Sequence, residues 1–423
     1  MKAFGNLRAK AQASIDDATS LTKNSVSSIL GSKSEPKGPT EEEIALKKAR
    51  LAIPKRDTDR PLRILSLDGG GVRGYSALII LRDFLANLQQ DEGLDEPILP
   101  ADYFDLIIGT STGGILALML GRLRMTVEEC LEAYRTLARE VFSGGLISTT
   151  FNATTTMLFE GGRLTLYDES TLEKSVKATV KKWTADDNED ALLFDPSPDS
   201  CRTAIVTALS ADATRPVLMR SYPGDPKLKG IKIWEAARAT SAAPVFFRPL
   251  IAGPEEISYI DGAVSGNSNP SLLALEEIEK LWPKERKIGL FLSLGTGSPN
   301  QVALQGQVTQ LAFALANLTT NTIHVHEKAV LWFTQHFTDK SQNPYERFTV
   351  ESSIQGVRMD DHSSLPKIAE ETTVYLRKEV EKMKRLVELA RGTMKSLKKG
   401  KEAEAKNPEQ ADPVPPYEAQ TTH

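Results

Sequence analysis

The chain has 423 residues, of which 40% are hydrophobic and 26% are charged, close to the average for soluble globular proteins. Its net charge of −4 gives no basic field of the kind that nucleic-acid binders carry, so we expect no nucleic-acid partner. Two cysteines, Cys130 and Cys201, are too few for a disulfide framework or a zinc cluster, and no apolar run approaches the ~20 residues that span a bilayer.

Residues 1–60 have the composition of an appendage rich in Ser, Lys and Ala. Apolar positions within 4–29 recur every eleven residues, which places them on one stripe of a helix. Residues 1–33 carry five basic and two acidic side chains, so this arm is either a basic amphipathic helix for an anionic membrane surface or a disordered tail. The start lacks the apolar region of a secretory signal peptide, and we expect a cytoplasmic location.

From Leu62 onward, short apolar runs alternate with helical patterns. The runs 62–67 and 103–109 each end at a glycine-containing turn and lead into predicted helices at 75–90 and 111–120. This alternation predicts α/β layers around a mostly parallel sheet. Further strands are expected at 203–209, 216–222, 257–261 and 287–295, helices at 126–142 (opened by a Thr126–Glu129 capping box) and 234–244, and a surface loop at 187–200.

Residues 365–400 have the pattern of one long helix with heptad-type apolar spacing. The stretch 377–401 carries ten basic and three acidic residues, so this helix docks on the core, lies on a membrane, or joins a coiled coil. The apolar positions are Val380, Met383, Val387, Ala390, Met394 and Leu397. We therefore divide the chain into an N-terminal arm (1–60), an α/β domain (61–350), a basic helix region (351–400) and a disordered tail (401–423).

A glycine loop, DGGGVRG at 68–74, lies between the first predicted strand and the first helix. Three of its glycines fit GxGxxG, but a dinucleotide site also needs an acidic residue at the end of the second strand, and 107–110 has none. Consecutive glycines expose backbone N–H groups beside a helix N-terminus, where a phosphate or an oxyanion is stabilised. A tight turn without a ligand is the alternative.

The sequence GTSTG at 109–113 matches GxSxG between a predicted strand and a predicted helix. In this motif a serine sits on a sharp turn with its hydroxyl exposed, and small residues on both sides allow the strained geometry. We therefore predict that Ser111 is a nucleophile, with Gly109 and Gly113 forming the elbow.

A serine nucleophile needs a base, and the first 323 residues contain no histidine. Of the later histidines, His362 in a predicted loop is the best candidate for a Ser–Asp–His arrangement. The competing candidate is Asp261, which ends a predicted strand and is followed by the small residues Gly262 and Ala263. A carboxylate can act as the base when a dry site raises its pKa.

Three motifs in this order, DGGGVRG at 68–74, GTSTG at 109–113 and DGA at 261–263, resemble the patatin-like phospholipase family. The string WEAARATSAAPVFFRP at 234–249 is similar to its calcium-independent phospholipase A2 branch, and the resemblance spans about 62–348. It implies a three-layer α/β/α sandwich with a central, mostly parallel sheet. The N-terminal arm and the C-terminal helical extension lie outside the family pattern.

The resemblance also implies a Ser–Asp dyad in place of a triad, with Ser111 as nucleophile and Asp261 as base. It implies an oxyanion hole formed by backbone N–H groups, and a mechanism that requires no metal or cofactor. The residues carried over beyond the dyad are Gly69, Gly70, Gly71, Arg73 and Gly74 in the glycine loop, Gly109 and Gly113 in the elbow, and Gly262 and Ala263 in the DGA motif.

The function that the resemblance implies is metal-independent hydrolysis of glycerolipid acyl esters, as by a phospholipase A2 or lysophospholipase. The substrate would reside in a membrane or a lipid droplet, so we expect a cytoplasmic, peripherally membrane-associated protein. An acyltransferase that passes the same acyl group to an alcohol or a lysolipid is the first alternative. A lipid-binding module without turnover is the second.

Overall fold

The computed structural model describes residues 51–143, 165, 167–244, 246–297, 309–350, 353–354 and 356–391, with the backbone alone at 309–321 and 340. The chain divides into the units Met1–Ala49 and Arg50–His423, and the following concerns the second. The predicted amphipathic stripe at 4–29 and the predicted tail at 401–423 lie outside the described residues.

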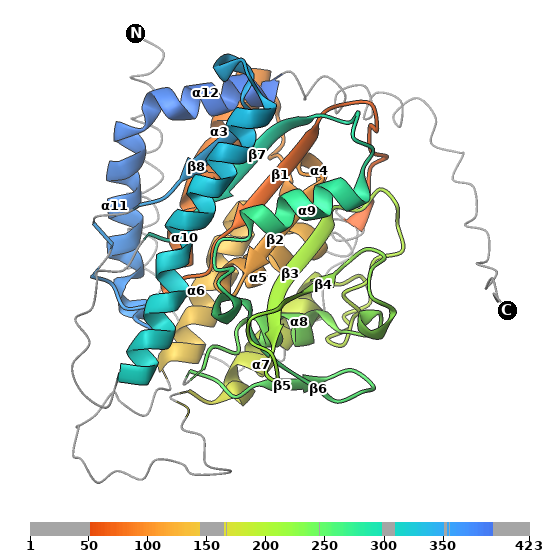
Figure 1. Cartoon of the computed structure of the whole chain (residues 1–423), viewed down its shortest axis with the longest axis vertical. Coiled ribbons are helices and arrows are strands. Elements are labelled where there is room, and N and C mark those ends of the chain that lie inside the picture. Colours follow the sequence, from red (N-terminus) through yellow and green to blue (C-terminus); the bar gives the residue numbers. More distant parts are fainter. Residues whose placement is uncertain are drawn as a thin grey trace, which may run out of the picture. The chain divides into compact units, whose positions relative to one another are not determined.

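In the described part of the chain, eight strands form one sheet in the order β5-β6-β3-β2-β1-β7-β8, with β4 paired to β3 (Figure 1). The parallel strands are β1 (Leu62–Leu67), β2 (Leu106–Thr110), β3 (Arg202–Leu209), β7 (Ile288–Leu294) and β8 (Tyr345–Phe348). The antiparallel additions are β4 (Pro216–Arg220), β5 (Leu250–Ala252) and β6 (Ile257–Asp261).

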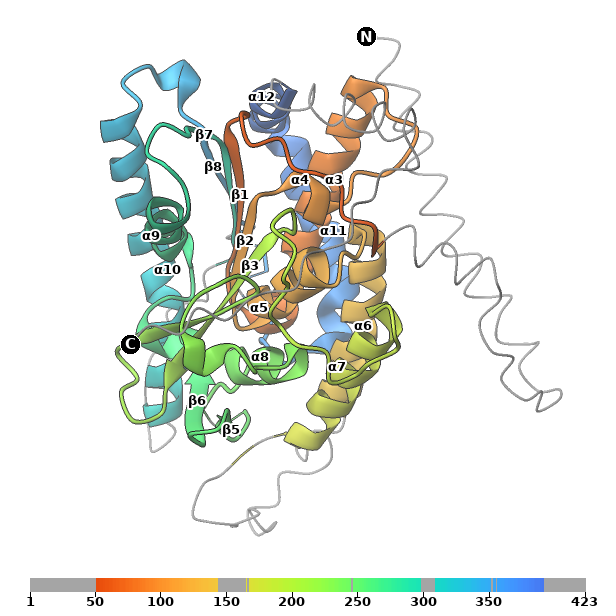
Figure 2. The same cartoon turned by 90° about the vertical axis from the view of Figure 1, so that its right-hand side faces the viewer.

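Helices cover both faces of this sheet, which gives the three layers of an α/β/α sandwich (Figure 2). One face carries α9 (Ser271–Leu281) and α10 (Thr309–His336). The other face carries α3 (Gly74–Glu92), α4 (Pro100–Tyr103), α5 (Thr112–Ala117), α6 (Val127–Ser143), α7 (Glu169–Trp183), α8 (Ile233–Thr240), α11 (Leu365–Lys378) and α12 (Val380–Arg391). The predicted fold class is confirmed.

Strand β1 shows why the sheet is buried on both faces. Its side chains alternate, so that Leu62 and Ile64 belong to the apolar core beneath α9 and α10, whereas Leu65 and Leu67 belong to the core on the opposite face. A strand between two helical layers is apolar at nearly every position. This explains why the run 62–67 shows no polar alternation in the sequence.

The predicted strands 62–67 and 257–261 have the bounds expected, and the Thr126–Glu129 capping box forms at the start of α6. The last residue of the predicted arm, Arg60, contacts this compact unit. Arg60 donates two hydrogen bonds to the buried Asp105 carboxylate, at 2.6 and 2.9 Å.

The predicted single helix over 365–400 is two helices, because the chain leaves the helical path at Glu379. Of the apolar stripe, Met383, Val387 and Ala390 are buried and α12 packs against α3, whereas Val380 is 40% exposed. The docking interpretation is therefore confirmed within the described residues; Met394 and Leu397 lie outside them. Among the helices of the described ranges, none combines the length and apolar character needed to cross a bilayer.

Candidate active site

Ser111 lies between the end of β2 and the start of α5, on a backbone with φ 54° and ψ −126°. A positive φ is uncommon for a residue with a side chain and has to be held by its surroundings. The Ser111 N–H donates to Thr240 Oγ1 at 2.7 Å, and the Thr240 hydroxyl donates to the Val206 carbonyl at 2.6 Å. Helix α8 therefore fixes the turn that exposes the serine hydroxyl.

The two glycines of the predicted elbow are required by close backbone approaches. A Cβ atom at Gly109 would lie 2.0 Å from the Gly113 carbonyl oxygen, and one at Gly113 would lie 2.2 Å from the Leu67 carbonyl oxygen. Any side chain at either position would push β1, β2 and α5 apart. The elbow motif is thus a packing requirement between the first two βα units.

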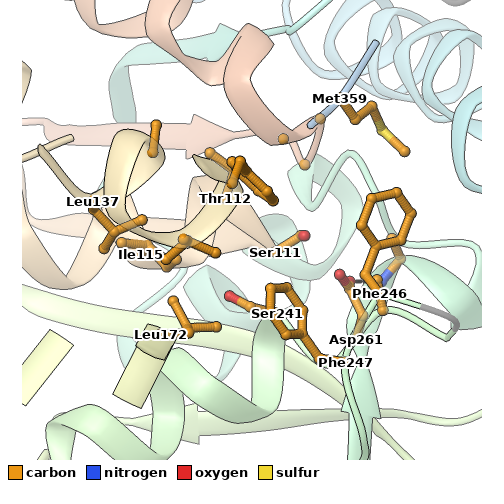
Figure 3. A pocket seen from close by; sticks show the side chains of 18 of the residues that line it. Ser111, Thr112, Ile115, Leu137, Leu172, Ser241, Phe246, Phe247, Asp261 and Met359 are labelled. Atoms are coloured by element: carbon orange, nitrogen blue, oxygen red, sulfur yellow. Dashed lines mark hydrogen bonds between the residues drawn. The ribbon is translucent and has the colours of Figure 1, made fainter. Parts of the chain in front are cut away.

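Asp261, the last residue of β6, is brought to Ser111 by strand β3. Thr110 pairs with Val206, and Asp261 pairs with the next residue, Thr207, on the same edge of β3, because β4 occupies the opposite edge at both positions. Ser111, which follows Thr110, and Asp261 therefore lie at the same level of the sheet. Figure 3 shows the Ser111 and Asp261 side chains pointing toward one another.

The Asp261 carboxylate is in a dry environment, with the residue only 1% exposed. Burial raises its pKa from 3.8 to about 7, because the charged form loses its solvation. The Ser111 hydroxyl and the Ala263 N–H, which donates to Oδ1 at 2.9 Å, favour the carboxylate and limit the rise. Near neutral pH this group can both accept and release a proton.

In the glycine loop the amides divide into those already bonded and those left open. The Gly69 N–H donates to the Ser268 carbonyl at 2.9 Å, and the Val72 N–H donates to the Met359 carbonyl at 2.8 Å. Within the part of the chain that the structure describes, the N–H groups of Gly70 and Gly71 have no such acceptor. Three glycines were predicted to supply an oxyanion hole. The Gly69 N–H is already hydrogen-bonded, whereas Gly70 and Gly71 border the pocket with open N–H groups.

Arg73 and Gly74 lie behind the loop and do not line the pocket. The Arg73 guanidinium is buried, which lowers its pKa to about 10, and its Nε donates to the Gly70 carbonyl at 3.4 Å. Gly74 begins α3, where a Cβ atom would lie 2.5 Å from Thr112 Cγ2. Both residues support the loop and the elbow from the helical side.

A largely apolar pocket of about 790 Å³, part of it open to solvent, surrounds Ser111 and Asp261. Its wall is formed by side chains that the motif analysis did not single out: Ile115, Leu137, Ala138, Val141, Phe142, Leu172, Phe246, Phe247 and Met359 (Figure 3). Those of α6 lie on the apolar face of an amphipathic helix, and a sequence cannot tell whether such a face meets a core or a cavity.

No histidine lines this pocket among the residues that the structure describes. His362, the best candidate for a triad, has its Nε2 3.2 Å from the Ser143 hydroxyl, at the end of α6. His326 contacts the Tyr345 hydroxyl, and its burial lowers its pKa to about 4. Nor do the described residues contain a group of three His, Cys, Asp or Glu side chains placed to hold a metal ion.

Comparison with known proteins gives a consistent result. The family model described as patatin-like phospholipase matches residues 65–275. The chain is 30% identical over 359 residues to calcium-independent phospholipase A2-gamma of Rattus norvegicus, an alignment that covers 80% of this chain and 42% of that protein. It is 34% identical over 283 residues to the Homo sapiens protein of that name, which covers 63% of this chain and 33% of the relative.

A bacterial relative, the cGAMP-activated phospholipase of Vibrio cholerae serotype O1, is 31% identical over 220 residues, which covers 51% of this chain and 58% of that protein. The chain thus spans between one third and three fifths of the length of these relatives. The region that the family model matches includes the glycine loop, the elbow and the DGA motif.

Proposed function

This chain belongs to the patatin-like phospholipase family, and on that premise we propose that it hydrolyses fatty-acyl esters of glycerolipids. One observation supports this most directly: the Ser111 hydroxyl and the Asp261 carboxylate face each other inside an apolar pocket bordered by two open backbone amides. An ester hydrolase needs a nucleophile, a base, an oxyanion site and a binding surface for the acyl chain, and these features supply all four.

In the proposed first step, Ser111 Oγ attacks the ester carbonyl carbon while the Asp261 carboxylate takes the hydroxyl proton. The carbonyl oxygen becomes an oxyanion that accepts hydrogen bonds from the Gly70 and Gly71 amides. The tetrahedral intermediate collapses, Asp261 returns the proton to the leaving alcohol, and an acyl–Ser111 ester remains. Water then attacks this ester with Asp261 again as base, which releases the fatty acid and restores the serine.

The electrostatics of the pair suit this mechanism. A base works best when its pKa lies near the working pH, and burial holds the pKa of Asp261 at about 7. Because Asp261 directly faces Ser111, no histidine relay is required. Every role in the two steps is filled by a side chain or an amide of the chain, so we expect hydrolysis to persist in EDTA.

We further propose that residues 61–350 form the catalytic domain and that the substrate is reached at a membrane or lipid-droplet surface from the cytoplasmic side. Acyl lipids reside in such assemblies, and the Phe246 and Phe247 side chains give the pocket aromatic walls. Met359, from the segment after this domain, also lines the pocket, so the domain works together with the first part of the 351–400 region.

The test is an assay of wild type and Ser111→Ala, in EDTA, on a fluorogenic short-chain ester and on phosphatidylcholine vesicles. Ser341→Ala, at an exposed turn outside the pocket, is the matched control. We expect fatty-acid release by wild type and Ser341→Ala and none by Ser111→Ala. The proposal would be refuted if a folded Ser111→Ala protein released fatty acid at the wild-type rate. If the wild type hydrolysed neither substrate, the result would favour a lipid-binding module.

The same assay separates the alternatives that keep an acyl-enzyme. With an added lysolipid acceptor, a transacylase forms a diacyl product at the expense of free fatty acid, whereas a hydrolase forms mainly fatty acid. His362→Ala distinguishes the dyad from a triad. We expect it to retain most of the activity, whereas a triad member would lose ~10³-fold or more.

A further inference from the structure

A buried ion pair lies at the N-terminal end of the glycine loop. Asp68, the residue before Gly69, receives two hydrogen bonds from Arg347, with Nη2 2.6 Å from Oδ2 and Nη1 3.2 Å from Oδ1. Asp68 is 2% exposed and Arg347 is 8% exposed. Arg347 lies in β8, outside the residues that the family model matches.

Strand pairing positions the Arg347 side chain. Ser66 of β1, Ser293 of β7 and Arg347 of β8 stand opposite one another in three adjacent strands. The Ser293 hydroxyl accepts a hydrogen bond from Arg347 Nη1 at 2.7 Å, which orients the guanidinium toward the end of β1. A planar guanidinium bound by two hydrogen bonds fixes the carboxylate in direction as well as in distance.

Two further hydrogen bonds hold the glycine loop in place. The Thr296 hydroxyl donates to the Gly69 carbonyl at 2.6 Å, and Met359 accepts the Val72 amide. A Cβ atom at Gly70 would lie 2.1 Å from Thr296 Oγ1, so the backbone at Gly70 is packed closely against the Thr296 side chain. The open amides of Gly70 and Gly71 thus stand between fixed neighbours, and the ion pair fixes the N-terminal end.

The energetics favour a role in orientation. Burial raises the pKa of Asp68 despite the opposing effect of Arg347, so desolvation outweighs the attraction between the two charges. A buried ion pair adds little net stability relative to apolar residues of the same volume. Amides that bind an oxyanion, in contrast, are effective only when they are held in place before the charge develops.

We propose that Arg347 is a positioning residue, which through Asp68 holds the Gly70 and Gly71 amides in the orientation that binds the oxyanion. The inference builds on the proposed function. It also gives the C-terminal helix a role, because Lys382 of α12 donates to the Arg347 carbonyl and Arg385 is paired with Glu346. Helix α12 thereby holds β8, and β8 holds the glycine loop.

The experiment compares Arg347→Met and Arg347→Lys with a matched ion pair elsewhere. Arg220 of β4 and Glu277 of α9 form a similar two-bonded pair, at 2.6 and 2.8 Å, and neither residue lines the pocket. Arg220→Met is therefore the control for simple loss of an ion pair whose carboxylate is buried. For each variant we would measure Tm, and kcat and KM on a soluble short-chain ester.

We expect Arg347→Met to lower kcat by on the order of 10²-fold with little change in KM, because oxyanion donors act mainly in the transition state. Arg347→Lys should recover part of kcat, since it restores the charge without the paired geometry. Affinity for a trifluoromethyl ketone, which forms a tetrahedral oxyanion on Ser111, should fall in parallel with kcat/KM. Arg220→Met should lower Tm comparably and leave kcat near that of wild type.

Wild-type kcat in a folded Arg347→Met protein would overturn the inference, as would an equal loss of kcat in Arg220→Met. If Arg347→Met does not fold, Asp68→Asn is measured against Glu277→Gln by the same criteria, because both changes keep side-chain shape and remove one charge. These failures are distinct from failure of the proposed function, in which the wild type itself would show no hydrolysis that depends on Ser111.

Discussion

Asp261 pairs with Thr207 across strands β6 and β3, and this register brings its carboxylate opposite the hydroxyl of Ser111. Strand β2, which precedes the serine, pairs with the same edge of β3, and β4 occupies the opposite edge. The relationship between the two side chains is therefore set by two hydrogen-bonded ladders. A rigid sheet of this kind supports a reaction that needs close alignment of its groups.

Hydrolysis should depend on the protonation of Asp261. In the proposed mechanism Asp261 acts as the base only as a carboxylate, and burial holds its pKa at about 7. We expect kcat/KM on a soluble ester to rise as the pH increases through about 7 and to level off above it. A pH–rate profile over the folded range measures this, and a rate already constant from pH ~5 upward would show that another group is the base.

Stability should respond to Asp261 in the opposite direction. Its pKa is higher in the folded state than in the unfolded chain, so the folded state binds more protons between about pH 4 and pH 7 and loses stability as the pH rises through this window. A shift of about three units corresponds to on the order of 4 kcal/mol. The free energy of unfolding of Asp261→Asn, relative to wild type, should therefore increase from pH 4 to pH 7 and then stay constant. Denaturant titrations across this range test it, and a difference independent of pH would contradict it.

Acyl-chain preference should respond to the wall of the pocket on α6. Ala138 is 1% exposed and lines the pocket, so Ala138→Leu adds side-chain volume where we propose that the acyl chain lies. The ratio of kcat/KM for long-chain to short-chain esters should fall by about tenfold, which is ~1.4 kcal/mol and within the usual cost of overpacking. Arg139→Leu, the exposed neighbour on the same helix, should leave the ratio unchanged. An equal ratio in both variants would place the acyl chain elsewhere.

The docking of the C-terminal helix should be visible in stability. Leu386 of α12 is fully buried in the core that includes α3, and Leu386→Ala should lower the free energy of unfolding by ~2–5 kcal/mol. Val380, on the same helix and 40% exposed, should cost no more than ~0.5 kcal/mol when changed to Ala. Urea denaturation compares the two. Equally small effects would mean that α12 contributes little to the fold.

Local sequence patterns predicted much of this fold because their physical causes are local. The glycine loop and the GxSxG elbow need residues that tolerate tight backbone contacts, and the strands between two helical layers are mostly apolar. Strand β8 was not predicted, since Glu346 and Arg347 interrupt its apolar pattern. Both are buried nonetheless, because distant residues pair with their charges.

Local sequence patterns were sufficient to predict the nucleophile candidate, the glycine loop and the layered α/β class, because these features depend mainly on residues close to one another along the chain. The choice between Asp261 and His362 remained open until the family resemblance was considered, because each candidate is far from Ser111 along the chain. Only the tertiary structure places Asp261 opposite Ser111, directs His362 to Ser143, and brings Arg347 to Asp68. Strand register and buried charge pairing are long-range properties, and no local spacing encodes which distant partner will complete a site.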